Sequence, residues 1–254
     1  MVTSTLLAAG WTVLDNLRKR NFEPEAMWIP RLLTPKGIGL HVGASNGRHT
    51  YLMAKAATCG HIYAFEPSSF TFPILKQVMR LHRLHNVSCY NLAICDKQGT
   101  ARLSVPIKLN GQMGHSFGYI QTDGTRQRND LRFKEETVYP VQTITLDHFV
   151  NRENLRGVDL IRIDAEGAEG MIIHGSKSLF EQFRPNALIE FHPHILRNLF
   201  STDCNDLLGF FFNLGYECFY LKEGNLVPTD RIIEERFRDY FLLHPARRVG
   251  AIRR

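Results

Sequence analysis

The sequence predicts an α/β protein with a mostly parallel central sheet. From residue 38 onward, short apolar runs alternate with amphipathic stretches, a pattern typical of parallel strands joined by crossover helices. Several of these runs end in glycines or carboxylates, at the sheet edge where ligands of such folds bind. The 254 residues, 44% hydrophobic and 22% charged, have the composition of an ordinary folded domain.

The first 36 residues predict a helical preface to a single domain at 37–254. Helix-like apolar spacing covers 5–20 and 24–33, and the Thr-Pro-Lys-Gly segment that follows predicts a turn. The opening apolar stretch has no basic residue before it, so we do not expect a signal peptide. We expect no membrane span, because no run approaches the roughly 18 apolar residues that a span needs.

The elements of the main domain follow in chain order. Parallel strands are expected at 38–42, 62–65, 87–94, 158–163 and 187–191, and helices at 48–57, 69–84 and 205–214. An added strand is expected at 99–105 and ordered chain at 138–146. Two last strands, at 216–221 and 241–243, would form an antiparallel pair at the C-terminal edge of the sheet.

The segment 107–136 lacks a clear period. It is rich in Gly, Asn, Gln, Asp and Arg, and loops of that length are usually functional or disordered. We therefore expect a long surface excursion. Residues 111–132, including His115, are expected to form a substrate lid, because binding residues concentrate on loops held by a rigid scaffold.

Charge and cysteine content limit the classes of partner and the compartment. The formal net charge is +6, but four arginines lie in the last nine residues, so a basic tail at 245–254 explains much of the excess. We do not expect nucleic acid or a membrane as the partner, because no recognition motif accompanies the charge. The five cysteines include no C-x-x-C pair, which predicts reduced thiols in the cytoplasm and neither disulfides nor a zinc site.

A glycine turn is the first chemical signal. The strand at 38–42 runs into Gly43 and Gly47 and then into a predicted helix. Such a turn lets backbone N–H groups approach a ligand, and the helix N-terminus favours its negative end. The Gly-x-x-x-Gly spacing differs from the Gly-x-Gly-x-x-Gly dinucleotide fingerprint. The alternative is that both glycines serve only the turn.

Glu66 is the second signal. It ends the strand at 62–65 about 20 residues after the glycine turn, where an acid in such sheets accepts hydrogen bonds from ribose hydroxyls. The alternative is that Glu66 caps the helix that begins near Ser68 and Ser69.

Two further strands end in titratable side chains. Asp164, Glu166 and Glu169 follow the strand at 158–163, and at least one of these carboxylates should face the site. The alternative is that Glu166 and Glu169 only favour the next helix N-terminus. The strand at 187–191 leads into His192. Histidine is the usual general base for a hydroxyl, so His192 is a candidate for that role. The alternative is a loop histidine whose hydrogen bonds are satisfied by the protein. The sequence predicts no metal site.

Six segments together resemble the FkbM-type methyltransferases in order and spacing. They are His41–Gly47, Phe65–Pro67, Asn91–Gly99, Thr145–Asp147, Arg162–Glu169 and Glu190–His192. The resemblance covers about residues 38 to 222. It implies a Rossmann-like methyltransferase fold with helices on both faces of the sheet, S-adenosylmethionine as cofactor, and O-methylation of a hydroxyl on a sugar, glycan or secondary metabolite.

The resemblance also implies roles for individual residues. Gly43, Asn46 and Gly47 would wrap the methionine part of the cofactor, with His41 beneath it, Glu66 would bind the ribose, Asn91 and Ala93 would lie by the adenine, and Asp164 would lie near the reacting end. Alignment of the acceptor with the methyl group supplies much of the rate enhancement in such transfers. Removal or orientation of the acceptor's proton is assigned to Asp164, Glu166 or His192.

Two positions depart from the family pattern. His41 stands where the family has Asp, and Arg162 stands where it has Lys. The change to His41 removes a carboxylate expected to hold the cofactor's amino group. Cofactor binding is therefore expected to fall as the pH drops through roughly 6.5, where an imidazole becomes charged.

Three other functions share part of this pattern. A nicotinamide-dependent oxidoreductase would share the sheet but needs a dinucleotide-type glycine turn, which is absent. His41 leaves open a catalytically silent cofactor-binding module. The net charge leaves open a nucleic-acid methyltransferase.

Overall fold

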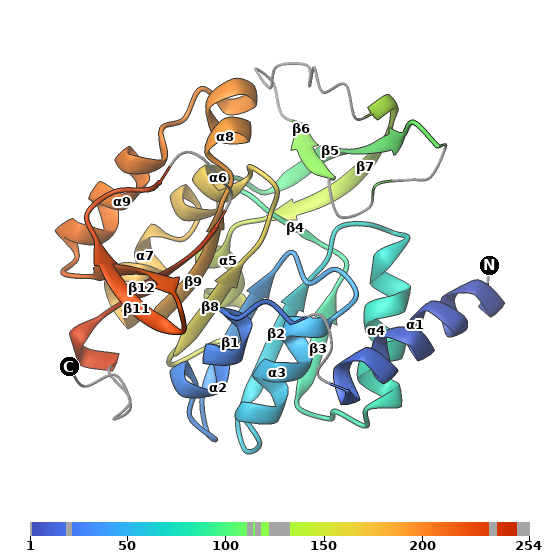
Figure 1. The fold of residues 1–254 in the computed structure, drawn as a ribbon, viewed down its shortest axis with the longest axis horizontal. Helices are drawn as coiled ribbons and strands as arrows, with labels where there is room; N and C mark the ends of the chain where they lie inside the picture. Colours follow the sequence, from blue (N-terminus) through green and yellow to red (C-terminus); the bar gives the residue numbers. More distant parts are fainter. Residues whose placement is uncertain are drawn as a thin grey trace.

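The computed structural model describes residues 2–18, 22–110, 114, 118–121, 133–233 and 238–247. Figure 1 shows a central sheet with helices on both faces and a smaller sheet beside it. Most of the predicted lid, including His115, and the tail from residue 248 onward lie outside the described residues.

The main sheet has eight strands in the order β11-β10-β12-β9-β8-β1-β2-β3. They are β1 (Ile38–Val42), β2 (His61–Phe65), β3 (Val87–Tyr90), β8 (Leu160–Ile163), β9 (Asn186–Phe191), β10 (Glu217–Lys222), β11 (Asn225–Thr229) and β12 (Arg238–Leu243). Strands β3, β2, β1, β8 and β9 pair in parallel. β12 is antiparallel and lies between β9 and β10. The predicted mostly parallel sheet with an antiparallel C-terminal edge is confirmed.

Five helices pack on one face of this sheet (Figure 1). They are α5 (Leu146–Arg152), α6 (Glu169–His174), α7 (Lys177–Phe183), α8 (Pro193–Phe200) and α9 (Cys204–Asn213). Because side chains alternate along a strand, Ile161 and Ile163 face these helices while Leu160 faces the opposite layer. Strands buried on both faces in this way read as continuous apolar runs, which is the pattern found in the sequence.

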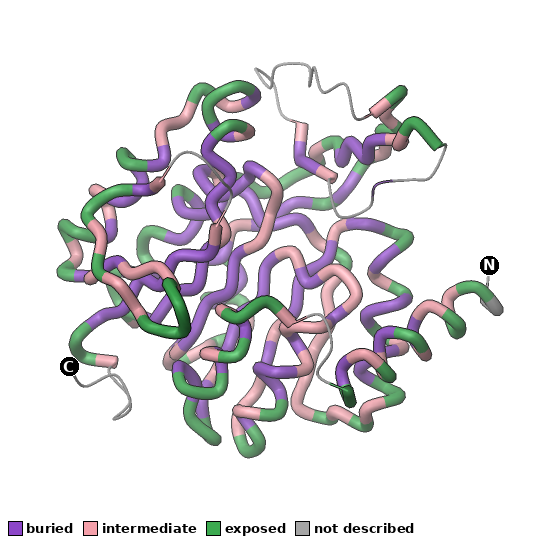
Figure 2. Tube along the Cα trace, in the orientation of Figure 1, coloured by how far each residue is buried: buried purple, intermediate pink, exposed green. Residues whose placement is uncertain are grey.

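The other face is covered by the N-terminal half of the chain. Its helices are α1 (Val2–Leu17), the short 3₁₀ helix η1 (Ala26–Trp28), α2 (Ile29–Leu32), α3 (Arg48–Ala56) and α4 (Thr71–Leu81). The predicted helices at 5–20 and 24–33 correspond to α1 and to η1 with α2. α1 packs on α4 through Ala9, and Figure 2 shows its outer side exposed along much of its length. That side carries Leu6, Leu7, Trp11, Leu14 and Leu17.

The smaller sheet corrects two expectations. Its strands, in the order β4-β7-β5-β6, are β4 (Ala93–Ile94), β5 (Gly99–Lys108), β6 (Tyr119–Gln121) and β7 (Phe133–Ile144). The predicted strand 87–94 is therefore two strands in two different sheets, separated at Asn91 and Leu92. The predicted excursion at 107–136 is shorter than expected, because β5 and β7 pair from Gly99 with Thr143 to Lys108 with Phe133. Polar side chains on an exposed strand gave no apolar period to detect.

Short elements account for the remaining differences. The helices α5 to α8 have six to eight residues each, too few turns for a clear helical period, and β11 is exposed or half-buried throughout. A short 3₁₀ helix, η3 (Pro245–Arg247), follows β12.

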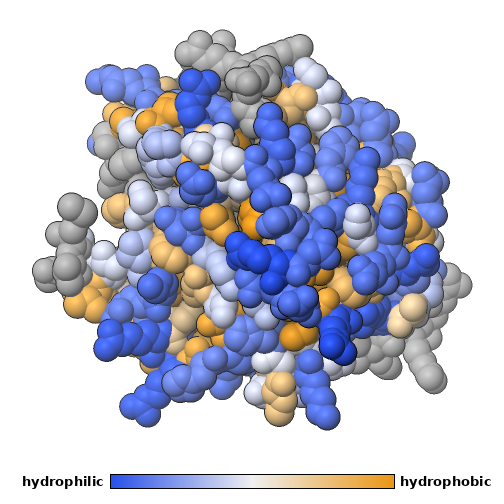
Figure 3. Space-filling view, turned by 180° about the vertical axis from the view of Figure 1, so that it is seen from behind, coloured by the Kyte–Doolittle hydropathy of each residue, from blue (hydrophilic) through white to orange (hydrophobic). Residues whose placement is uncertain are grey.

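Seen from behind, the surface is largely hydrophilic with scattered apolar side chains (Figure 3). Within the described ranges, no helix is both long enough and apolar enough to cross a membrane.

Candidate active site

A cavity of about 280 Å³ lies at the carboxyl ends of β1, β2 and β8. The smaller sheet closes one side of it through Leu103 and Ile120. Of the predicted site residues, those that line the cavity are His41, Gly43, Asn46, Glu66, Ala93, Asp164 and Glu166. Residues from four segments of the chain thus meet at the edge where ligands of open α/β sheets bind.

The glycine turn forms one wall of the cavity. Gly43 has φ +78°, and a Cβ on it would lie 1.7 Å from the carbonyl oxygen of Asp164, so β1 and β8 come together here only because residue 43 is glycine. Gly47 has φ +88° and immediately precedes α3, and a Cβ on it would meet Met79 and Leu75. Gly47 itself does not line the cavity among the described residues. Gly47 instead lets the turn pack closely against Leu75 and Met79 of α4.

Two non-glycine residues at the cavity adopt left-handed backbone conformations. Ser45 has φ +48° and Glu166 has φ +49°, a region that costs roughly 1–3 kcal/mol per residue and is enriched at functional sites. Ser45 follows β1 and Glu166 follows β8, and both line the cavity. Each strained residue turns the chain sharply at the end of a strand and keeps it beside the cavity.

Glu66 holds two parts of the wall together. Its Oε2 accepts a hydrogen bond from the Ser45 N–H at 2.7 Å, and its Oε1 accepts from the Ser68 N–H at 2.9 Å and the Thr71 hydroxyl at 2.7 Å. Burial raises the pKa of Glu66, against the effect of these hydrogen bonds. The capping role considered from the sequence belongs to the Ser68 hydroxyl, which accepts from the Phe70 and Thr71 N–H groups at the start of α4. The Glu66 carboxylate instead fixes the glycine turn and faces the cavity.

The predicted adenine end is built from the segment between the two sheets. Asn91 does not line the cavity; its amide donates to the Glu66 and Pro67 carbonyls at 2.8 and 3.0 Å. This fixes the chain so that Leu92 and Ala93 line the cavity. Asn46 also lines the cavity and donates to the Thr12 hydroxyl of α1 at 3.4 Å.

His41 is buried with only one of its ring nitrogens paired. It is 1% exposed, and Nδ1 lies 2.7 Å from the Thr50 hydroxyl. Nε2 has no hydrogen-bond partner among the described residues. Burial and the positive neighbours His49 and Arg162 hold the pKa of His41 well below its usual value. The expected titration near pH 6.5 is therefore wrong, because this ring stays neutral.

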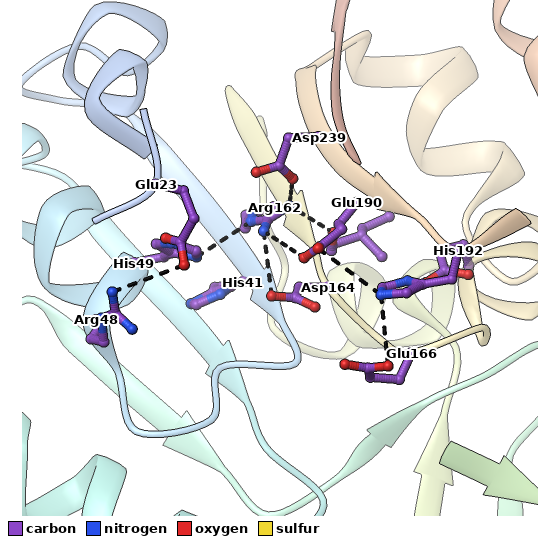
Figure 4. A network of polar contacts seen from close by, with 12 residues as sticks. Glu23, His41, Arg48, His49, Arg162, Asp164, Glu166, Glu190, His192 and Asp239 are labelled. Atoms are coloured by element: carbon purple, nitrogen blue, oxygen red, sulfur yellow. Dashed lines mark hydrogen bonds and ion pairs between the residues drawn. The ribbon is translucent and has the colours of Figure 1, made fainter. Parts of the chain in front are cut away.

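Arg162 is the centre of a buried charge network (Figure 4). It is 1% exposed and pairs with Asp239, with Asp164 Oδ2 at 3.3 Å and with Glu190 Oε2 at 3.4 Å. Burial and the Asp164 carboxylate raise the pKa of Glu190 to about 9, against the effect of Arg162. Glu190 therefore keeps its proton at neutral pH. Arg162 and His41, the two departures from the family pattern, are directly paired positions on β8 and β1.

His192 lies behind the cavity rather than in its wall. Its Nδ1 is 3.0 Å from Glu169 Oε1 and its Nε2 is 3.6 Å from Glu166 Oε2. Burial alone would lower the pKa of His192, but the hydrogen bond and charge of Glu169, with the charge of Glu166, raise it to about 10. A charged His192 holds these two carboxylates in place and cannot accept a proton.

Glu23, Arg48 and His49 form a second charged group at the cavity, and the sequence analysis gave none of them a role. Glu23 Oε2 lies 2.9 Å from His49 Nε2, and its Oε1 lies 3.9 Å from Arg48 Nη2 (Figure 4). Although burial raises it, the hydrogen bond to His49 lowers the pKa of Glu23 to about 2. Arg48 and His49 directly follow Gly47, so their positions in the first turn of α3 were the available signal; nothing in the sequence connects Glu23 to them. No cluster of three His, Cys, Asp or Glu side chains within the described ranges could hold a metal ion.

Comparison with known proteins agrees with this architecture. The model of the methyltransferase FkbM domain matches residues 41–218. "Methyltransferase 1" of Beauveria bassiana (strain ARSEF 2860) is 27% identical over 158 residues, which are 58% of this chain and 61% of that protein. The crystal structure of methyltransferase FkbM from Methylobacillus flagellatus KT superposes with a TM-score of 0.52 at 10% identity, covering 83% of this chain and 44% of that one.

The two relatives are longer than the part they share with this chain: the matches span 61% and 44% of their lengths. The structural likeness establishes the Rossmann-like methyltransferase fold, and the domain match covers well over half of the chain. This chain belongs to the family of FkbM methyltransferase domains.

Proposed function

We propose that this chain transfers a methyl group from S-adenosylmethionine to a hydroxyl oxygen of a sugar, glycan or other small metabolite. The observation that carries the proposal is a single cavity that joins the Gly43 turn, the Glu66 carboxylate and Asp164. These groups come from three parallel strands and meet at one edge of the sheet, as the family pattern requires.

The residues present fit such a cofactor. The cavity, about 280 Å³, is near the lower end of the roughly 300–1,000 Å³ of small-molecule sites. Glu66 offers a carboxylate acceptor for ribose hydroxyls, and Leu92 and Ile94 offer an apolar surface for a base. The unpaired Nε2 of His41 offers a polar contact at the other end. We propose that Gly43, Asn46 and Gly47 shape the methionine end, and Asn91 and Ala93 the adenine end.

For the reaction, the bound cofactor supplies an electrophilic methyl group for an in-line displacement. The chain's own task is to align the acceptor and take up its proton. Asp164 is the first candidate acceptor of that proton, since its side chain is 29% exposed and lines the cavity, and Arg162 fixes its orientation. Glu166 is the second, with the charged His192 orienting it. Glu190 retains its own proton.

The lining of the cavity supports a small hydroxylated acceptor. Among the described residues, it includes one guanidinium, that of Arg48, the protonated Glu190, and four further acids, Glu23, Glu66, Asp164 and Glu166. Carboxylates accept hydrogen bonds from hydroxyls and repel phosphates. The lining therefore favours sugars and related metabolites over nucleic acid. We also propose a cytoplasmic location, because the five cysteines are free thiols.

Calorimetry followed by a transfer assay tests this function. The full chain is titrated with S-adenosylmethionine, its demethylated product S-adenosylhomocysteine, and NADH. We expect both sulfur ligands to bind and NADH not to bind. The chain is then incubated with S-adenosylmethionine and a panel of sugars, glycans and polyhydroxylated metabolites, and products are analysed by mass spectrometry for an added methyl group. Binding of NADH in place of the sulfur ligands would overturn the proposal.

A catalytically silent cofactor-binding module is the second candidate. The observation that favours it is the neutral, buried His41 at the position where the family has a carboxylate. The same experiment separates the two functions. Cofactor binding without methyl transfer, in the natural chain and with every acceptor, supports the silent module, whereas transfer to any hydroxyl supports the enzyme.

A further inference from the structure

Two side chains at the cavity, one buried and one half-buried, have buried nitrogen atoms whose hydrogen-bonding capacity the described protein does not use. The first is His41, whose Nε2 is buried and unpaired. Its Nδ1 contacts the hydroxyl of Thr50, which is 0% exposed and has no other hydrogen bond among the described residues. A buried hydroxyl needs an acceptor for its hydrogen, so Thr50 donates to Nδ1. In this neutral tautomer Nε2 carries the ring hydrogen.

The second side chain is Arg48, the first residue of α3. Its Nε and Nη2 are buried and make no hydrogen bond within the described part of the chain. The nearest acid, Glu23, is 3.9 Å from Nη2, beyond hydrogen-bond distance. The Arg48 guanidinium lies over the Phe22 ring, 5.6 Å from its centroid, a cation–π contact that holds the group in place.

The backbone adds to this donor set. α3 begins directly after Gly47, which has no side chain to cap the helix. The first N–H groups of a helix have no intrahelical acceptor and carry partial positive charge. Arg48 and His49, the first two residues of α3, line the cavity together with His41. A guanidinium, a neutral imidazole N–H and a helix N-terminus all donate hydrogen bonds, so the complementary group is an anionic acceptor.

The other guanidinium beside the cavity does not compete for that anion. Arg162 already contacts Asp239, Asp164 and Glu190, so its charge is matched within the protein. The difference follows from the register of the sheet. Position 41 on β1 is paired with position 162 on β8, and an acid at 41 would lie beside Arg162. With His41 there, Arg162 takes its counterions from Asp164, Glu190 and Asp239. Beside α3, the Glu23 carboxylate lies 2.9 Å from His49 and leaves Nε and Nη2 of Arg48 without a hydrogen bond to any described residue.

We propose that His41 and Arg48 form a carboxylate-binding site for the α-carboxylate of the cofactor's methionine tail. The inference rests on the proposed function. An Asp at position 41 would bind the amino group of the methionine tail, whereas the proposal assigns the carboxylate of that tail to His41. Arg48 supplies the charge, His41 supplies a neutral N–H, and the first turn of α3 supplies backbone donors.

A ligand that lacks the carboxylate tests the site. The full chain and its Arg48→Met variant are titrated by calorimetry with S-adenosylmethionine and with decarboxylated S-adenosylmethionine. Arg48→Met keeps an unbranched stem of similar length, and Arg80→Met on the exposed side of α4 is the matched control. A His41→Phe variant tests the second donor and keeps the test open if one variant fails to fold.

We expect Arg48→Met to weaken binding of S-adenosylmethionine by roughly 10- to 100-fold, as for loss of a charge-assisted hydrogen bond. Binding of the decarboxylated ligand should change by less than about twofold, since it lacks the partner group. His41→Phe should show the same selectivity with a smaller change, and Arg80→Met should bind both ligands like the natural chain.

The failures of the two proposals are distinguishable. If Arg48→Met and His41→Phe weakened both ligands equally, or neither ligand, the carboxylate site would be wrong while the proposed function stood. If the natural chain bound neither ligand, the proposed function would fall and this site with it.

Discussion

At the residue scale, the charges of the candidate site are set by one buried guanidinium. Arg162 contacts three acids, and one positive charge cannot balance three negative charges in a buried site. The excess is relieved by protonation of Glu190, whose pKa burial and Asp164 raise to about 9. Asp164 is left as the acid with the most exposed side chain of the three.

The raised pKa of His192 predicts a pH-dependent stability. The folded state binds the proton of His192 more tightly than the unfolded state does, because the pKa of this histidine is near 6.5 in the unfolded chain and about 10 in the folded one. The stabilisation that His192 gives to the folded state is therefore fully present below pH 6.5 and is lost as the pH rises through about 10. We expect the difference in unfolding free energy between the natural chain and His192→Gln to shrink from pH 6.5 to 10, by at most about 1.4 kcal/mol per pH unit. Urea denaturation at pH 6, 8 and 9.5 measures it.

The exposed His194→Gln substitution is the matched control for this series. A difference between natural chain and His192→Gln that stays constant from pH 6 to pH 9.5 would mean that the ring of His192 is not charged in the folded protein.

Replacement of Glu66 is expected to lower the stability of the fold as well as to weaken cofactor binding. Glu66→Ala leaves the Ser45 and Ser68 N–H groups and the Thr71 hydroxyl without their acceptor. Buried donors left unpaired cost roughly 1–3 kcal/mol each before relaxation, so the free energy of unfolding should fall by about 3 kcal/mol. Urea denaturation checks this against Glu135→Ala, whose side chain is 65% exposed. Equal stabilities would show that Glu66 does not fix the turn.

At the element scale, the strands that form the cavity were the most predictable part of the chain. β1, β8 and β9 are buried on both faces and β2 is buried on one and half-buried on the other, and all four gave apolar runs within two residues of the observed bounds. The antiparallel pair of β5 and β7 was only partly predicted, because its outer residues are polar and its pairing joins segments far apart in sequence. β4 was merged with β3, since only the tertiary structure separates the two sheets.

Substitution by alanine should change the stability in opposite directions at Gly43, which follows β1, and at Gly209, which lies in α9. Gly43→Ala places a Cβ 1.7 Å from the Asp164 carbonyl oxygen at φ +78°, so we expect a loss of about 3 kcal/mol or more, or failure to fold. Gly209→Ala, inside α9 with no atom within 4 Å of the new Cβ, should gain roughly 0.5–1 kcal/mol. Thermal unfolding compares the two. A Gly43→Ala variant as stable as the natural chain would contradict the close contact of β1 with β8.

At the scale of the whole molecule, the sequence predicted the residues at the strand ends of the candidate site better than the groups that pair with them. Gly43, Glu66 and Asp164 end strands that all point to one edge, and chain order alone brings them together. Asp239 was not predictable, because it reaches Arg162 only through the insertion of β12 beside β9, where it pairs with Glu190. Glu23 was missed for the same reason, since it precedes the sheet and meets His49 only in the folded chain.

A crystal structure of the full chain grown with S-adenosylhomocysteine tests the central claim most directly. We expect the nucleoside in the cavity at the ends of β1, β2 and β8, with a ribose hydroxyl within hydrogen-bond distance of the Glu66 carboxylate and the base beside Leu92 and Ala93. The methionine tail should point to the turn between Gly43 and Gly47. Ligand density at any other place, or an unchanged cavity in crystals grown with saturating ligand, would contradict the account.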